Sequence, residues 1–174
     1  MNDVLPILID KCVSHKNIKV IKLSFNDIVF KERNKILCFY CGNYGHKWTC
    51  PPKCPTVDYK EIFKEYDNYL FIQTTIDSTI DNARAKSTMI IHKLLLELER
   101  ILYDNNIPTR LSFIGGSCKL CKGGCAVDKC RRPYEARIPL EATGVDIMET
   151  CKGTELEIKF PVNEILTRTG MIMW

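Results

Sequence analysis

The chain has 174 residues, of which 45% are hydrophobic and 26% charged, a composition typical of a soluble protein that can fill a core. Its formal charge of +4 is too small to favour nucleic acid as a partner, and no apolar run approaches the roughly 18 residues that span a membrane. The unusual figure is ten cysteines against three histidines. The first residues, which include Asp3 and Asp10, do not match a secretory signal. We therefore expect a cytoplasmic protein, in which clustered cysteines bind metal more often than they form disulfides.

The hydrophobic pattern predicts strands and helices on either side of two cysteine-rich segments. Apolar residues at helical spacing indicate helices, whereas aromatic and β-branched runs indicate strands. In chain order we expect one or two strands over 18–30, a mostly buried strand over 69–76, a long helix over 82–105, a strand over 109–114, a helix over about 139–151 and a last strand over 169–174.

The order strand, long helix, strand over 69–114 predicts a βαβ unit with two parallel strands and a right-handed crossover. We therefore expect an α/β fold in a single domain over 1–174, with a mostly parallel sheet, a βαβ core and two cysteine-rich metal-binding loops at 38–54 and 118–130. The second loop begins just after Gly115-Gly116, beyond the end of a predicted parallel strand. Ligands of open α/β sheets bind at that edge, and glycines let the backbone approach a cofactor closely.

The first cysteine-rich loop has the spacing C-x2-C-x8-C-x3-C. Its four cysteines are Cys38, Cys41, Cys50 and Cys54. Two residues between the first pair let both thiolates reach one metal centre, and the prolines around the second pair stiffen the backbone. A structural zinc site usually closes with a tighter second pair than the C-x3-C found here.

The second loop has the spacing C-x2-C-x3-C-x4-C. Its four cysteines are Cys118, Cys121, Cys125 and Cys130. This spacing is close to the bacterial ferredoxin run C-x2-C-x2-C-x3-C-P, and its compactness favours a [4Fe–4S] cluster over a single ion. Zinc in one or both loops remains an alternative, because tetrahedral all-thiolate sites also suit zinc. Disulfides are a further alternative, which an intracellular location disfavours.

Several motifs around the cysteines resemble those of one prokaryotic family. They are Cys38-x2-Cys41-x2-Tyr44-Gly45-x4-Cys50-Pro51-Pro52, Gly115-Gly116-x-Cys118-x-Leu120-Cys121, Cys130-Arg131-x-Pro133 and Glu141-Ala142-x-Gly144-Val145-Asp146. The family is domain of unknown function 2284, whose members are described as predicted metal-binding proteins. The resemblance covers most of the chain. It implies a cytoplasmic protein, typical of anaerobes, with iron–sulfur sites and no established reaction.

These observations predict an iron–sulfur protein that binds two [4Fe–4S] clusters and acts as a redox or electron-transfer protein, or as a component of a redox enzyme. Basic residues around the second loop would then compensate the negative charge of the cluster, or dock an acidic redox partner protein. If Cys38, Cys41 and Cys50 alone hold one cluster, an iron keeps an open position. An open iron can act as a Lewis acid, so an enzyme acting on a sulfur- or thiol-containing small molecule is the first alternative. A zinc-stabilised binding module is the second.

Overall fold

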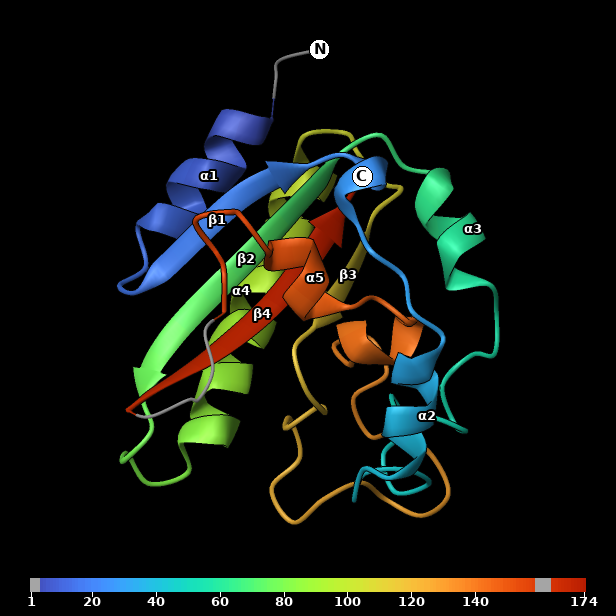
Figure 1. Ribbon diagram of the computed structural model, residues 1–174. Helices are drawn as coiled ribbons and strands as arrows, with labels where there is room; N and C mark the ends of the chain where they lie inside the picture. The colour runs from blue at the N-terminus through green and yellow to red at the C-terminus, as the bar shows by residue number, and fades with distance from the viewer. Residues whose placement is uncertain (1–3, 159–163) are drawn as a thin grey trace.

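A four-stranded antiparallel sheet runs through the middle of the molecule in the computed structural model (Figure 1). The structure describes residues 4–158 and 164–174, so Asp3 of the N-terminal segment lies outside the described residues. The strands are β1 (Ile18–Leu23), β2 (Tyr69–Asp77), β3 (Leu111–Ile114) and β4 (Ile165–Met173). Their order across the sheet is β1-β2-β4-β3, and all three pairings are antiparallel.

The expectation of a mostly parallel α/β sheet is wrong, because the fold is α+β with an antiparallel sheet. β2 and β3 point in the same direction, since each is antiparallel to β4, but β4 lies between them. The strand–helix–strand order therefore does not create a pair of neighbouring strands. Residues Tyr69 to Thr74 of β2 are all buried. An antiparallel sheet covered on both faces produces such a run as readily as a parallel sheet does.

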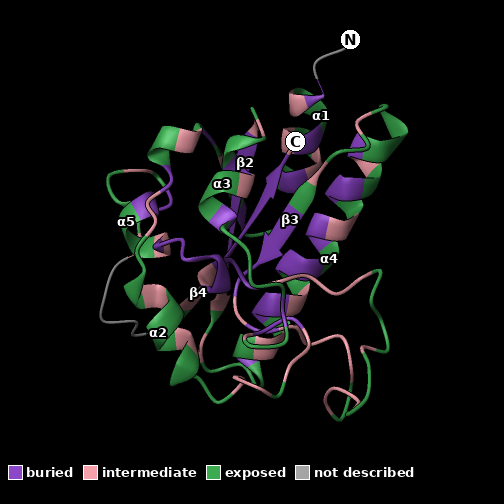
Figure 2. Cartoon of the chain, turned by 90° about the vertical axis from the view of Figure 1, so that its right-hand side faces the viewer, coloured by how far each residue is buried: buried purple, intermediate pink, exposed green. Residues whose placement is uncertain are grey.

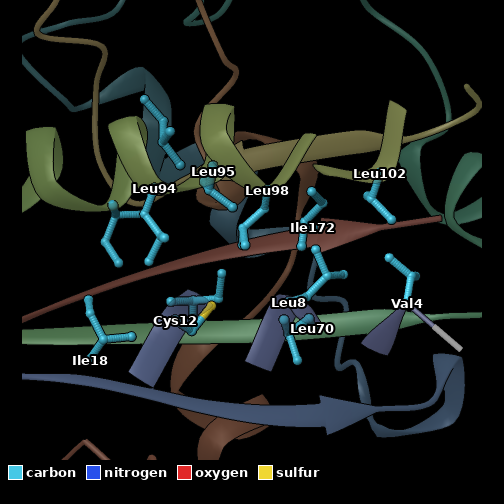
Figure 3. Packing of buried hydrophobic residues seen from close by; sticks show 13 residues of the cluster. Val4, Leu8, Cys12, Ile18, Leu70, Leu94, Leu95, Leu98, Leu102 and Ile172 are labelled. Carbon is cyan, nitrogen blue, oxygen red and sulfur yellow. The ribbon is translucent and has the colours of Figure 1, made fainter. Parts of the chain in front are cut away.

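Helices α1 (Leu5–Val13) and α4 (Ala83–Asp104) cover one face of the sheet. Buried leucines at positions 94, 95, 98 and 102 form the apolar stripe of α4 and meet Leu8 of α1, Leu70 of β2 and Ile172 of β4 (Figure 3). β4 allows this close approach at Gly170, where a Cβ atom would lie 2.5 Å from Cγ2 of Ile91.

The other face of the sheet is covered by shorter elements. These are α3 (Tyr59–Lys64), α5 (Ile147–Cys151) and the 3₁₀ helices Phe25–Asp27 and Leu140–Thr143. Their buried side chains, such as Phe63, pack with Phe71 and Phe113 of the sheet, whose strands are purple in Figure 2. The helix expected over 139–151 is two pieces, because Gly144 adopts φ +92° and Asp146 caps a new helix through the Glu149 N–H.

The helix α2 (Arg33–Phe39) was not expected, and the region over 18–30 holds one strand rather than two. α2 is tied to the segment before α5, since Asn34 Nδ2 donates to the Val145 carbonyl (3.0 Å) and Arg33 pairs with Asp146 (2.7 Å). The loop that follows α2 and the loop that follows β3 both lie at the lower end of the molecule in Figure 1. Among the described residues, no helix combines the length and apolarity needed to cross a membrane.

Candidate metal centres

The first cysteine group consists of Cys38, Cys41, Cys50 and Cys54, and a chain of tight turns holds it together. Cys38 lies in the last turn of α2, and its carbonyl accepts the Cys41 N–H (3.1 Å). The Cys54 N–H likewise donates to the Cys50 carbonyl (3.1 Å). The side-chain amide of Asn43 donates to Cys41 Sγ (3.4 Å). The local backbone thus brings the two cysteine pairs into one compact loop.

The thiols of this group influence one another. Burial raises the pKa of Cys38, and the nearby Glu141, Cys41 and Cys54 raise it further. Burial raises the pKa of Cys50 to about 12. These two thiols are therefore protonated near neutral pH without a metal, and a metal ion that binds them must displace their protons.

Three of these four thiols face a large cavity of about 670 Å³. Cys38, Cys41 and Cys50 belong to its lining, whereas Cys54 is not among the described residues that line it. Cys54 is buried instead beside Tyr59. Burial raises the pKa of the Cys54 thiol, and the Tyr59 hydroxyl opposes this rise only in part. The first group therefore presents three thiols to an open space and keeps the fourth behind them.

The second cysteine group consists of Cys118, Cys121, Cys125 and Cys130, and all four line one small cavity of about 10 Å³. A space of this size holds about one water molecule. Burial raises the pKa of Cys118, and the other three cysteines of the group add to this rise.

The two cysteine groups are neighbours. The loop of the first group covers the second, because Trp48 lines the small cavity and its indole N–H donates to the Ala126 carbonyl (2.9 Å). Thr49 lines the small cavity while the next residue, Cys50, lines the large one. On the other side, Ser117 lines the large cavity and Cys118 the small one. Two consecutive pairs of residues thus form a shared wall between the cavities.

All ten cysteines lie within the described ranges and are free thiols. Within those ranges, no three His, Cys, Asp or Glu side chains are close enough together to hold a single metal ion. The cysteines predicted to be ligands therefore lie in two groups that correspond to the sequence clusters. Within the described ranges, neither group arranges its thiols around a single metal position.

The model of the family described as "Predicted metal-binding protein (DUF2284)" matches residues 21–174. The chain belongs to this family. The match includes both cysteine groups and all four strands except part of β1. No curated protein and no solved structure matches the chain. Membership of DUF2284 agrees with the resemblance of the cysteine motifs and supports metal binding as the class of function.

The large cavity of this family member also contains a polar cluster, which the sequence did not reveal. The Gly116 N–H donates to both carboxylate oxygens of Glu141 (3.0 and 3.1 Å). Arg168 of β4 lies against the same backbone, since a Cβ atom on Gly116 would be 3.0 Å from its Nη1. Burial raises the pKa of Glu141, an effect that Gly116 and Arg168 oppose. Arg84, from the first turn of α4, lines the cavity as well.

The double glycine after β3 gives the chain a sharp turn, since Gly116 adopts φ +71°, and it also permits a close approach of β4. A Cβ atom on Gly115 would clash with the Thr169 carbonyl oxygen and lie 2.7 Å from Cδ of Arg168. The sequence signal for this contact was Arg168, two residues before Gly170. It is an isolated charge in a strand whose other side chains are apolar or hydroxylated. The expected strand began at Thr169 and left that arginine out.

Two of the basic residues near the second group have partners of their own. Arg137 forms two hydrogen bonds with the carboxylate of Glu99 on α4 (2.6 and 2.5 Å). Arg132 pairs with Glu135 (2.5 Å). Three other basic side chains on this loop of the DUF2284 chain are exposed, namely Lys122, Lys129 and Arg131.

Proposed function

We propose that this protein is an iron–sulfur protein that binds one [4Fe–4S] cluster in each cysteine group and acts as a redox protein or a component of a redox enzyme. The observation that carries the proposal is the shared wall between the two cavities, at Thr49–Cys50 and Ser117–Cys118. Redox centres on the two sides of one wall would be neighbours, as electron exchange between them requires. This arrangement supports electron transfer more than it supports two unrelated structural sites.

The residues present fit such clusters by their donor chemistry, because thiolates are the usual ligands of [4Fe–4S] centres. The first group has ample space beside it. The second group surrounds room for about one water, so a cluster there needs the loop to widen. A Cβ atom on Gly123 or Gly124 would have no atom within 4 Å, so open space lies beside these two residues of the loop. When bound, the clusters would supply one-electron transfer, while the protein holds and shields them.

The second candidate function is an enzyme that uses the first group alone. It is favoured by the three thiols that face the large cavity and by the position of Cys54 behind them. A metal held by three thiolates keeps a position for a ligand from the cavity, where it would supply Lewis-acid chemistry to a sulfur- or thiol-containing compound. The protein would bind that compound between apolar walls and the polar cluster around Glu141.

A zinc-stabilised binding module is the remaining alternative, and the small space inside the second group favours zinc there. In the proposed redox function, a partner protein would dock with acidic side chains on the exposed Lys122, Lys129 and Arg131 beside that group. We place the protein in the cytoplasm, because ten free thiols suit a reducing compartment.

The test is anaerobic purification followed by measurement of iron, acid-labile sulfide and zinc, with electron paramagnetic resonance of the reduced protein. Two clusters predict about eight iron atoms per chain and as much sulfide. Cys130→Ser should remove about half of the iron, because it breaks the second group. Cys54→Ser is the matched variant in the first group, and an unchanged spectrum there would favour the open-site enzyme. Stoichiometric zinc without sulfide would refute the iron–sulfur proposal.

A further inference from the structure

We infer that the large cavity binds a small organic monocarboxylate, with its carboxylate held by Arg168 and Arg84 and its hydrocarbon part lying toward the wall of Cys38, Cys41 and Cys50. The inference deepens the proposed function by naming the ligand class of the first group. The inference rests on the proposed function only for the metal beside Cys38, Cys41 and Cys50. The carboxylate site itself is formed by protein residues alone.

The cationic end of the cavity has hydrogen-bond donors to spare. The Arg168 side chain runs along the Gly115–Gly116 backbone, and its Nε–H is buried with no partner among the described residues. Burial lowers the pKa of Arg168, Glu141 opposes this shift, and Arg84 is near enough to lower the pKa as well. Two guanidinium groups at one cavity repel each other, and a carboxylate between them would accept hydrogen bonds from both.

The charges around the cavity leave this end positive. Two carboxylates belong to its lining, but Asp146 is already paired with Arg33 (2.7 Å). Among the described lining residues, Glu141 remains as the one unpaired carboxylate beside the two arginines, and it accepts the Gly116 N–H. The excess of one positive charge suits a ligand with one negative charge. A second carboxylate on the ligand would lie near Glu141 and the thiols of the first group, and Glu141 would repel it.

The rest of the cavity suits a hydrocarbon chain. Its volume of about 670 Å³ falls within the roughly 300–1,000 Å³ typical of small-molecule sites. Leu37, Val145, Met148 and Leu166 contribute apolar walls. Glu141 lies close enough to Cys38 to raise the pKa of its thiol, so the polar cluster and the cysteine wall are adjacent. A short chain anchored at the arginines would therefore reach the metal-binding thiols.

Binding is tested by calorimetric titration of the anaerobically purified protein with straight-chain monocarboxylates from acetate to octanoate and with the matching amides. We expect affinity to rise with chain length until the cavity is filled. Each amide should bind at least tenfold more weakly than its acid, because it lacks the charge that the arginines recognise. Succinate, the dianion, should bind more weakly than butyrate. Absence of binding by every acid, or equal binding of acids and amides, would overturn the inference.

Variants identify the site. Arg168→Gln should weaken carboxylate binding at least tenfold, and Arg84→Gln, near the surface, should weaken it without risk to the sheet. Arg100→Gln is the control, because its side chain is exposed near the far end of α4. Circular dichroism establishes that each variant is folded, and Arg168→Lys keeps the charge if the glutamine variant unfolds.

Metal content is measured on the same samples, which separates this inference from the proposed function. Zinc in place of iron would contradict the iron–sulfur proposal and leave the carboxylate site intact. If instead Arg168→Gln and Arg84→Gln alter metal retention while carboxylate affinity stays unchanged, the two arginines are counter-charges for the metal centre and the carboxylate site is refuted.

Discussion

Replacing Glu99 with glutamine tests the ion pair that joins α4 to the segment after the second cysteine group. Glu99 accepts two hydrogen bonds from Arg137 and one from the Ser112 hydroxyl of β3. The side chains of Glu99 and Arg137 are only 12% and 19% exposed. Glutamine keeps the shape of the residue but removes the charge, so Arg137 keeps a largely buried and uncompensated positive charge.

Removing one partner of a buried ion pair typically costs 3–5 kcal/mol, and the small residual exposure here places the expected loss near the lower end, about 3 kcal/mol. For a protein of this length each kcal/mol lowers the melting temperature by about 2–4 °C, so Glu99→Gln should melt about 6–12 °C lower. Glu97→Gln is the matched control on the same helix. Its pair with Lys11 is 46% and 36% exposed and should contribute less than about 1 kcal/mol.

Urea denaturation gives the free energy of unfolding of each variant, including the double variant Glu99→Met/Arg137→Met, which removes both charges of the pair. The double variant should be more stable than Glu99→Gln, because methionine at both positions leaves no unpaired buried charge. The reasoning fails if Glu99→Gln costs no more than Glu97→Gln, or if the double variant loses as much as the single one.

Three further predictions concern packing, pH and thiol chemistry. Gly170→Ala should destabilise the protein by about 1–3 kcal/mol, because its Cβ would press on α4, whereas Gly42→Ala, with nothing within 4 Å, should be neutral in the same urea titration. Burial lowers the pKa of His92, so near pH 6.5 the histidine is protonated in the unfolded chain but stays neutral in the folded protein. Stability should therefore fall as the pH drops below that value, by at most about 1.4 kcal/mol per pH unit from this residue, and His92→Gln should remove that part of the slope. Burial raises the pKa of Cys12 to about 12. After metal chelation, iodoacetamide should therefore modify the exposed Cys41 well before Cys12, and peptide mass mapping showing equal rates would contradict the buried position.

Local elements were predictable wherever neighbouring residues determine them. The long helix was expected over 82–105 and spans Ala83–Asp104, because its apolar spacing and the asparagines on either side define it locally. The pairing of strands depends instead on residues far apart in the chain. β4 joins β2 and β3 from a distant part of the sequence, and the first residues of β4 are only partly buried. The charged Arg168 interrupts the apolar pattern of this strand, so the sequence predicts only its part from Thr169 onward.

The same division applies to the candidate site. The spacing of the cysteines identified both groups, since each group lies within a short loop. Arg168 and Glu141 come from β4 and a 3₁₀ helix, and they meet only because the sheet brings β4 beside β3. The isolated Arg168 of β4 was the one sequence signal of this meeting, and nothing around Glu141 indicates it. The double glycine predicts a turn, which the φ of +71° at Gly116 confirms, but it does not predict that β4 approaches Gly115 so closely.

The central position of β4 also determines the order in which the site can be assembled. During synthesis the thiols of both cysteine groups emerge before β4, which contributes Leu166, Arg168 and Thr169 to the wall of the large cavity. Until β4 inserts between β2 and β3, that wall is missing and the cysteine side of the cavity is open to solvent. The cavity is therefore complete only when β4 is paired on both sides, although the cysteines of its wall lie far earlier in the chain.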